Sequence, residues 1–340
     1  MLPGKTASQA VFDNYWRILK QAAFVRLGEL GAEIYRKWSR VMDRTELLRL
    51  YRMMLTSRRI DELEEQMTHR GEAFFQLSSS GHEATVALAS HLHEDDWLHC
   101  HYRDRALLIA RGLPVRTFFD NLLCNDHAPG RGRRMSPFMS DPALKILSMV
   151  TPTGNNALQS VGVAAAVRDR PGQPIVYNGV GDGTTQQGEF LEACAEAARS
   201  QLPVLFVIQD NKWAISTQTM QKTFYSMPEG KAANFCGIPI EYVNGSDVTI
   251  TNEVFQRTVA RMRDDRKPAI IVLELERLSS HTNADDHRIY REPSDLEQAR
   301  ATSDPIAISQ QHLLETGVTQ ADLQAIDSQI TDQIEAAQNE

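Results

Sequence analysis

Two short polar motifs follow apolar runs in the middle of the chain and have the residue types of a phosphate and metal site. They are Gly-Asp-Gly at 181–183 and Asp-Asn at 210–211, separated by the 26 residues 184–209. Glycines let a backbone approach an anion, and free N–H groups at the start of a helix, expected from about Gln187, favour phosphate. A carboxylate and an amide supply hard oxygen donors, which suit Mg²⁺ that bridges to phosphates. The pattern predicts a magnesium and phosphate site.

Other phosphate motifs fit this region less well. Gln186 occupies the third glycine position of the Gly-x-Gly-x-x-Gly dinucleotide fingerprint, and no Gly-Lys-Ser/Thr of a P-loop occurs. Two structural alternatives stay open from the residues alone. Asp182 would then cap the helix that follows it, and Asn211 would serve a turn.

The elements that must position these motifs alternate between strand and helix. Short apolar runs bounded by Gly, Pro or Asp occur at 174–180, 203–209, 238–244 and 268–275, and a helical stretch, 189–200, separates the first two. Strand, helix and strand at this spacing indicate a doubly wound α/β fold with a mainly parallel sheet. In such sheets ligands bind at the carboxyl ends of the strands, where both motifs lie.

Helical segments are expected on both sides of this region. Residues 10–42 have an apolar stripe that indicates a packing helix, with a membrane-surface or partner role as the alternative. A second helix is expected from Thr45 to Met67, and residues 74–92 are expected to be a loop leading into a helix. The acidic tail from about 294 to 340 is expected to be helical and docked. We therefore expect an N-terminal helical extension, 1–44, and one α/β domain with C-terminal helices, 45–340.

Composition and charge limit the classes of function. The formal charge of −8 argues against a nucleic-acid partner, and the arginines at 131, 133 and 134 fit either a solvated loop or a contact with phosphate or a partner chain. Four widely spaced cysteines argue against a zinc site or a disulfide framework. No apolar stretch is long enough to span a membrane, and the first ten residues lack the pattern of a signal peptide. We expect a bacterial-type cytoplasmic protein; a mitochondrial matrix location stays open for a longer precursor.

The residues around the two motifs resemble a known family. The segment 181–217, GDGTTQQGEFLEACAEAARSQLPVLFVIQDNKWAIST, is similar to the alpha subunits of the thiamine-diphosphate-dependent, decarboxylating component of 2-oxo-acid dehydrogenase complexes, of the pyruvate, acetoin and branched-chain types. The family motif is Gly-Asp-Gly followed at a similar distance by Asn-Asn. Further blocks follow in the family's order: SSGHEA (79–84), HYRDRALLIARG (101–112), GRGRRMSP (130–137), TPTGNNALQSVGVAAA (151–166) and HTNADDHRIYR (281–291). The resemblance spans roughly residues 45–335 and implies the thiamine-diphosphate-binding fold.

The resemblance implies a role for individual residues of this sequence. Asp182 and Asn211 would ligate Mg²⁺ through their side chains, and Trp213 through its backbone carbonyl. His281 matches the family's active-site histidine, which helps to pass the acyl group to lipoate. The remaining residues expected to bind the cofactor are Tyr102, Arg103, Thr151, Thr153, Gly181, Gly183 and Thr184. Arginine suits a diphosphate because its planar guanidinium pairs with two oxygens at once.

Three positions depart from the family pattern. Asp210 replaces the first asparagine of Asn-Asn and adds a negative charge beside the ligand position. Thr153 stands where a larger apolar residue props the bent cofactor, which puts that support in doubt. Thr282 follows His281 where the mitochondrial enzymes often carry a phosphorylated serine, so the same control is not expected here.

The resemblance further implies oxidative decarboxylation of a 2-oxo acid with transfer of the acyl group to a lipoyl-bearing acyltransferase. A beta-type chain would complete the site in an alpha₂beta₂ heterotetramer, because the glutamate that activates the cofactor lies on that chain. The segment 130–137 is closer to the branched-chain type than to the pyruvate type. Two alternatives remain: another two-chain thiamine enzyme with transketolase-like chemistry, and a non-catalytic paralogue.

Overall fold

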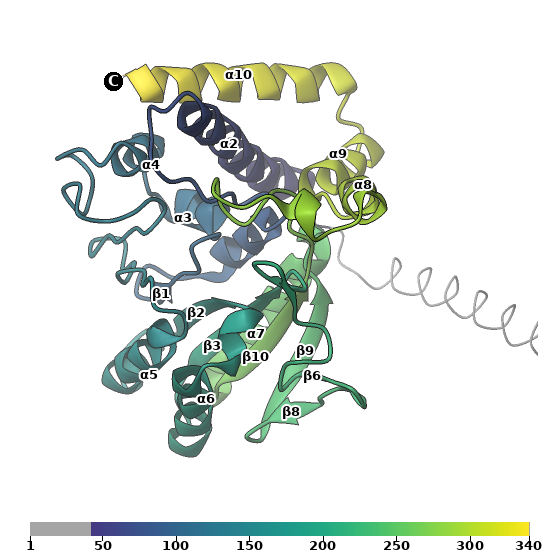
Figure 1. Cartoon of the computed structure of the whole chain (residues 1–340). Coiled ribbons are helices and arrows are strands. Elements are labelled where there is room, and N and C mark those ends of the chain that lie inside the picture. The colour runs from purple at the N-terminus through teal and green to yellow at the C-terminus, as the bar shows by residue number, and fades with distance from the viewer. Residues whose placement is uncertain (1–41, 340) are drawn as a thin grey trace, which may run out of the picture. The chain divides into compact units, whose positions relative to one another are not determined.

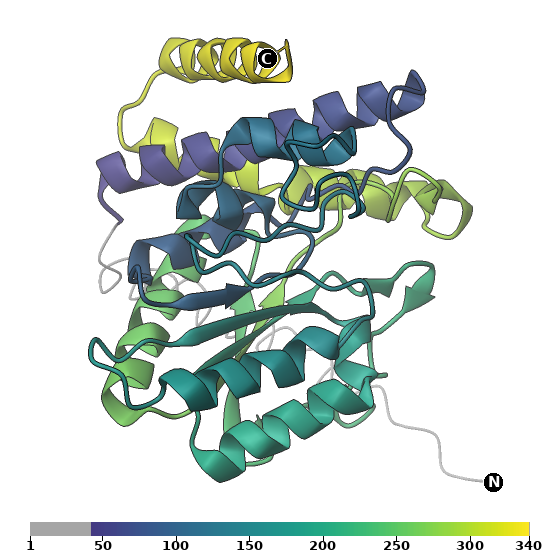
Figure 2. The ribbon, with the colours of Figure 1, turned by 90° about the vertical axis from the view of Figure 1, so that its left-hand side faces the viewer.

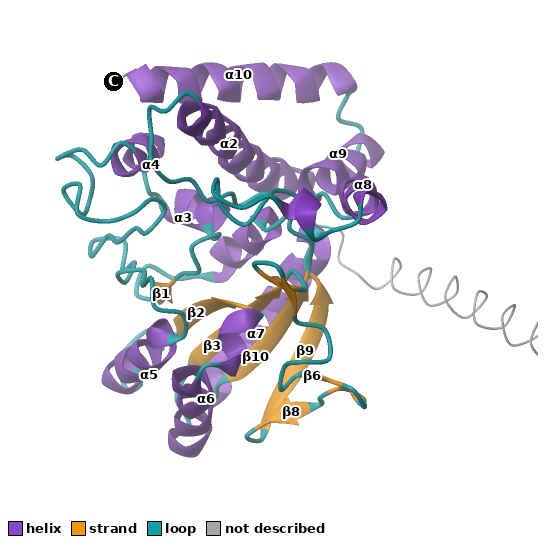
Figure 3. Ribbon diagram, in the orientation of Figure 1, coloured by secondary structure: helices purple, strands orange, loops and turns teal. Residues whose placement is uncertain are grey.

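A six-stranded sheet lies at the centre of the computed structural model, which describes residues 42–339 (Figures 1 and 3). Its strand order is β1 (Trp97–His99), β2 (Val176–Gly181), β3 (Val204–Asp210), β10 (Ala269–Glu274), β9 (Ile238–Asn244) and β8 (Asn234–Phe235). All neighbouring pairs are parallel except β8 and β9, which are antiparallel. The prediction of a doubly wound, mainly parallel sheet is confirmed.

The four strands expected from apolar runs all form, each within two residues of its expected bounds. Three of them, β2, β3 and β10, are almost fully buried because helices cover both faces, which explains their apolar runs in place of strict alternation. In β9, five of the seven residues are partly or largely exposed. β1 was not predicted. It has only three residues, and it pairs with β2 at the edge of the sheet.

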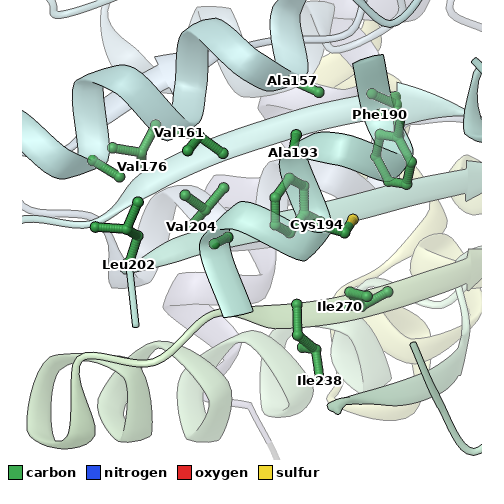
Figure 4. Packing of buried hydrophobic residues seen from close by; sticks show 14 of the residues in the cluster. Ala157, Val161, Val176, Phe190, Ala193, Cys194, Leu202, Val204, Ile238 and Ile270 are labelled. Carbon is green, nitrogen blue, oxygen red and sulfur yellow. The ribbon is translucent and has the colours of Figure 1, made fainter. Parts of the chain in front are cut away.

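Helices α5 (Asn155–Val167) and α6 (Gly188–Ser200) pack together against one face of the sheet (Figure 4). The buried side chains of α6 recur at helical spacing, at Phe190, Ala193, Cys194 and Ala197. They meet alternate residues of the strands, such as Val204, Phe206 and Ile208 in β3. This core fixes the position of the turn that carries Asp182, because α6 follows that turn directly.

The opposite face carries the buried polar side chains of Tyr177 in β2 and Gln209 in β3, which form hydrogen bonds with Asp104. Around this face lie α7 (Val248–Asp265), the 3₁₀ helix η1 (Glu83–His91) and α3 (Arg105–Arg111), and η1 packs against both helices. The loop and helix expected at 74–92 are confirmed in outline, although the helix is of the 3₁₀ type. Asp247 begins α7 by accepting hydrogen bonds from the backbone N–H groups of Thr249 and Ile250.

An outer layer of helices completes the described residues. It contains α2 (Arg44–His69), α4 (Val115–Leu122), α8 (Pro293–Thr302), α9 (Pro305–Glu315) and α10 (Gln320–Asn339). α2 matches the helix expected at 45–67. α10 packs on α2 and α4 through buried Leu323, Ile326, Ile330 and Ile334, as Figures 1 and 2 also show. The docked, helical tail is therefore confirmed.

Short elements and loops connect these layers. They are two hairpins, β4 (Trp213–Ala214) with β5 (Thr217–Gln218) and β6 (Ser226–Met227) with β7 (Gly230–Lys231), and the 3₁₀ helices η2 (Gly183–Gln186) and η3 (His287–Ile289). The helix expected at 10–42 lies outside the described residues, apart from its last position. No described helix has the length and apolar character needed to cross a membrane. None of the four cysteines forms a disulfide.

Candidate active site

The chemistry-bearing residues gather where the parallel strands end. The β2–β3 register pairs Gly181 with Gln209, so Asp182, which follows β2, and Asp210, the last residue of β3, lie side by side at the same edge of the sheet. β10 ends at the neighbouring position, since its Glu274 pairs with Asp210. The carboxyl ends of a parallel sheet form the crevice where ligands bind in doubly wound folds.

Asp182 is buried at the first turn of η2. Its Oδ1 accepts a hydrogen bond from the Gly183 N–H at 2.9 Å, and its Oδ2 accepts one from the Thr219 hydroxyl at 2.6 Å. Burial raises the pKa of Asp182 above its usual value of 3.8. Asp182 therefore caps a helix, but the helix is the short 3₁₀ helix η2 and not the longer one expected from about Gln187, which is α6 and has Gln187 as its N-cap. A carboxylate has about four acceptor positions, so these two hydrogen bonds leave room for a metal ion.

Asp210 places a second negative charge beside the first. Burial, followed by the neighbouring Asp182 charge, raises the pKa of Asp210 to about 6. Neither carboxylate forms an ion pair with a cation of the described residues. Two adjacent and largely buried carboxylates without an ion-pair partner are unfavourable, and a divalent cation would relieve their repulsion.

Asn211 and the hairpin that follows it complete this part of the crevice. The Oδ1 atom of buried Asn211 accepts a hydrogen bond from the Trp213 N–H at 3.1 Å, so the turn role is also present. The hairpin folds back over Asp182 through Thr219, whose N–H donates to the Lys212 carbonyl at 3.1 Å.

Gly183 permits this close approach of the hairpin. A Cβ at position 183 would lie 2.6 Å from the Cβ of Ala214, which is closer than carbon atoms pack. The predicted metal ligands Asp182, Asn211 and Trp213 are thus brought to one edge of the sheet. Among the residues that the structure describes, no cluster of three His, Cys, Asp or Glu side chains can hold a metal. A magnesium site here would use one carboxylate with amide and carbonyl oxygens.

Arg103 brings positive charge to the crevice from the loop after β1. Its guanidinium is buried, donates to the Ser78 carbonyl, and donates to His281 through both Nδ1 and the backbone oxygen at 3.1 Å. Burial lowers the pKa of Arg103. No carboxylate of the described residues pairs with it, and its Nε has no hydrogen-bond partner. Its neighbour Tyr102 places its ring 5.2 Å from the guanidinium carbon.

His281 lies in the loop after β10, as the sequence predicted. Burial, then the charges of Arg103 and Arg277, lower its pKa to about 3. Its Nδ1 faces guanidinium groups of both arginines, at 3.1 and 3.3 Å, and guanidinium groups only donate. The imidazole is therefore neutral near pH 7, with Nδ1 as the acceptor and the proton on Nε2.

The loop 281–290 is held by a set of polar contacts that the sequence analysis missed. Asp285 Oδ2 accepts from the His281 N–H at 2.7 Å and from the Tyr290 hydroxyl at 2.6 Å. Arg277 Nη2 donates to the same hydroxyl at 2.6 Å, and its nearest carboxylate is Asp285 at 4.0 Å. The only feature of the sequence that could have indicated Arg277 as a site residue is its position, three residues after β10 and four before His281.

A comparison with protein families gives this arrangement a context. The model of the family described as "Dehydrogenase E1 component" matches residues 51–340, most of the chain. The chain belongs to the dehydrogenase E1 component family. Its members use thiamine diphosphate, and the E1 component carries out the decarboxylation step of the 2-oxo-acid dehydrogenases.

The relatives of this E1 chain are alpha subunits. It is 28% identical over 298 residues to the 2-oxoisovalerate dehydrogenase subunit alpha of Bacillus subtilis, covering 87% of this chain and 89% of the relative. It is 29% identical over 297 residues to the 3-methyl-2-oxobutanoate dehydrogenase subunit alpha of Mycobacterium tuberculosis, covering 87% and 77%. It is 28% identical over 309 residues to the chloroplastic pyruvate dehydrogenase E1 component subunit alpha-3 of rice, covering 87% and 72%. The chain is thus an E1 alpha subunit, whose name implies a beta partner.

The remaining predicted residues of the E1 chain separate into two groups. Tyr102, Thr153 and Thr184 line one small cavity of about 20 Å³. Thr151 lies in the same loop as Thr153 but is exposed and does not line the cavity. His101 also faces this cavity, and neither of its buried ring nitrogens has a hydrogen-bond partner. It therefore has hydrogen-bonding capacity left for a ligand.

Proposed function

We propose that this E1 alpha subunit binds thiamine diphosphate through Mg²⁺ and takes part in the oxidative decarboxylation of a 2-oxo acid. The main support is the charge arrangement at the strand ends. Asp182 and Asp210 are adjacent carboxylates with no cation partner among the described residues, and Arg103 is a buried guanidinium with no carboxylate partner there. A Mg²⁺–diphosphate pair would bring a cation to Asp182 and Asp210 and an anion to Arg103.

The residues present fit this group. Asp182 and Asn211 would hold Mg²⁺ through side-chain oxygens and Trp213 through its carbonyl. Arg103 and Tyr102 would contact the diphosphate, with backbone contacts from Gly181, Gly183 and Thr184. The cofactor supplies, when bound, a carbon nucleophile and an electron sink for decarboxylation. Thr153 is smaller than the family's usual apolar prop, so a neighbouring chain would have to support the bent cofactor.

His281 carries the proposed catalytic role of this chain. It holds one proton on Nε2 while Arg103 and Arg277 fix its Nδ1 face. This tautomer can donate a hydrogen bond from Nε2 to the oxygen or sulfur of an incoming acyl acceptor. Burial and the positive charges of Arg103 and Arg277 keep the imidazole of His281 neutral, so the ring adds no positive charge of its own at this position.

The site of this chain is proposed to be completed by a beta subunit in an alpha₂beta₂ assembly. A lipoyl-bearing acyltransferase would receive the acyl group, and a cytoplasmic location fits these partners. Support comes from the alpha-subunit names of the relatives and from large apolar side chains exposed on the site-side hairpin and loops: Ile215, Met220 and Ile289. Burying these side chains against a partner would exclude water from the crevice.

The substrate is proposed to be a branched-chain 2-oxo acid, with pyruvate as the second choice. The segment 130–137 favours the branched-chain type. The relatives do not separate the two substrates, since a 2-oxoisovalerate subunit and a pyruvate subunit are both 28% identical to the chain.

The test uses this chain assembled with its beta-type partner chain. Thiamine diphosphate binding is measured by calorimetry with and without Mg²⁺, and decarboxylation is measured for pyruvate and 3-methyl-2-oxobutanoate with an artificial electron acceptor. Mg²⁺-dependent binding together with turnover of either acid supports the proposal. Turnover without acyl transfer to lipoate would point to transketolase-like chemistry. Absence of cofactor binding would identify a non-catalytic paralogue.

A further inference from the structure

A chain of buried hydrogen bonds leads from Asp104 to the proposed metal ligand Asn211. The side chain of Gln209 forms hydrogen bonds with Asp104 and with His82, and His82 forms a further one with Asn211. All four residues are at most 4% exposed. They come from the start of α3, the end of β3 and the loop before η1, so only the folded sheet brings them together.

Asp104 determines which groups donate and which accept in this row of hydrogen bonds. Its Oδ2 accepts from the His101 N–H at 2.7 Å and from the Tyr177 hydroxyl at 2.9 Å, and its Oδ1 faces Gln209 at 2.6 Å. A carboxylate only accepts hydrogen bonds. Gln209 must therefore present its NH₂ group to Asp104, and its carbonyl oxygen points the other way.

The orientation of Gln209 selects the tautomer of His82. Gln209 Oε1 lies 2.7 Å from His82 Nδ1, so this ring nitrogen has to carry the hydrogen. The Trp213 N–H donates to Asn211 Oδ1 and so turns the Asn211 NH₂ group toward His82 Nε2, which can accept a hydrogen bond only from a neutral ring. The neutral ring has one hydrogen, and Nε2 is left with a free lone pair.

The lone pair on His82 then orients the amide of Asn211. Asn211 Nδ2 lies 3.2 Å from His82 Nε2 and donates to it, and Asn211 Oδ1 accepts from the Trp213 N–H at 3.1 Å. The opposite orientation would place two acceptors together at His82 and two donors together at Trp213. The amide oxygen is thereby turned toward the hairpin that closes over Asp182.

We propose that His82 is a positioning residue for the metal site: its Nδ1–H tautomer, imposed by Asp104 and Gln209, holds the amide oxygen of Asn211 toward the cation. This inference rests on the proposed magnesium-dependent function. Histidine suits the role because the second nitrogen of a fixed tautomer transmits the orientation of one neighbour to the other.

The backbone around His82 is fixed as tightly as its side chain. Gly81 has a φ of +96°, and a Cβ at this position would lie 1.8 Å from the Glu276 carbonyl oxygen. Only glycine permits this approach of the segment to the end of β10. The N–H of Gly81 also donates to the Glu83 carboxylate at 2.8 Å. The backbone at Gly81 thus fixes the position of His82, and hydrogen bonds to Gln209 and Asn211 fix its imidazole.

The test compares two substitutions in the assembled alpha–beta enzyme. His82→Asn keeps a polar group near the Nδ1 position but has none that reaches Asn211, whereas His82→Gln reaches the Nε2 position. Mg²⁺ is titrated by calorimetry into protein that contains a constant excess of thiamine diphosphate. We expect His82→Asn to weaken Mg²⁺ binding about 10- to 100-fold, and His82→Gln to recover about half of that loss on a logarithmic scale. The affinity for thiamine diphosphate at saturating Mg²⁺ should change less than about threefold.

His99→Gln is the matched control, because His99 is also buried beside this strand edge but bonds only to the Ser148 carbonyl, at 3.0 Å. It should bind Mg²⁺ as the parent does. Unchanged Mg²⁺ affinity in folded His82→Asn, or an equal loss in His99→Gln, would overturn the positioning role. If the parent itself shows no Mg²⁺-dependent binding, the proposed function fails instead.

A second measurement observes the histidine tautomer in the parent protein and uses a variant only to assign its signal. Solid-state ¹⁵N NMR of the histidine-labelled parent distinguishes a protonated Nδ1 from a protonated Nε2, with the His82→Gln spectrum used to assign the signal. The expected result is a proton on Nδ1 with and without Mg²⁺. A proton on Nε2, or a charged ring near neutral pH, would refute the relay whatever the metal affinities are.

Discussion

Asp182→Asn is the sharpest test of the metal site because it removes one charge and almost nothing else. The asparagine has the size of the aspartate. Its Oδ1 can accept from the Gly183 N–H, and its NH₂ can donate to the Thr219 oxygen, which replaces the hydrogen bonds of 2.9 and 2.6 Å. The substitution also removes the charge that raises the pKa of Asp210. We expect the free energy of unfolding without ligands to change by less than about 1 kcal/mol.

The effect on metal binding should be much larger. Removing one partner from a buried ion pair costs about 3–5 kcal/mol. At 1.4 kcal/mol for each factor of ten, Mg²⁺ binding should weaken by about 100-fold to several-thousand-fold. Asp182→Ala should lose activity in the same way, and it should also lose about 1–3 kcal/mol of stability because the Gly183 and Thr219 donors lose their acceptor.

Calorimetric titration of Mg²⁺ at fixed thiamine diphosphate measures this effect, and urea unfolding of the ligand-free protein measures the stability. Glu189→Gln is the control for net charge, since Glu189 is exposed in the first turn of the neighbouring α6. If Asp182→Asn binds Mg²⁺ within about threefold of the parent, or about 0.7 kcal/mol, the carboxylate does not ligate the metal.

Three further predictions concern the loop and the outer helices. His281→Ala should impair lipoate-coupled activity more than decarboxylation with an artificial acceptor, and equal lipoate-coupled activity in mutant and parent would remove His281 from the active site. Tyr290→Phe removes the hydroxyl bonded to Asp285, so proteolysis of the loop should quicken about threefold or more, and thiamine diphosphate with Mg²⁺ should slow it; an unchanged cleavage rate would contradict the contact. The hydrogen bond to Asp247 raises the pKa of His312 above 6.5, so this pair stabilises fully below pH 6.5 and its contribution is lost as pH rises through the raised value. His312→Gln should therefore lower the free energy of unfolding, measured with urea, by up to about 1 kcal/mol at about pH 5.5 and change it little at about pH 9.

The elements that the sequence predicted well are those with a strong local signal. The strands β2, β3, β9 and β10 each contain a short apolar run with Gly, Pro or Asp at one end or both, and buried parallel strands such as β2, β3 and β10 favour such runs. β1 was missed because its three residues, Trp97–His99, carry too little periodicity to be recognised, and only pairing with β2 makes them a strand.

The site was predictable where residue type and local position agree. Asp182 and Asn211 could be placed because each follows a strand whose end was recognisable. His82, Gln209 and Arg277 could not be assigned in the same way, because their contacts depend on strand register and on loops distant in the chain. A histidine in a loop or a glutamine at a strand end has no distinctive spacing. Their roles become visible only when hydrogen-bond donors and acceptors are followed through the fold.

The charges of this crevice suit a ligand that carries both a positive and a negative charge. Arg103 and Asp182 feel each other's field but form no ion pair, since Arg103 is bonded to Ser78 and His281 and Asp182 to Gly183 and Thr219. Direct pairing would neutralise both charges and remove the site. Holding them apart leaves each charge incompletely compensated, which costs stability in the empty chain. The proposed metal–diphosphate pair would return that energy on binding, because its cation would meet Asp182 and its anion would meet Arg103.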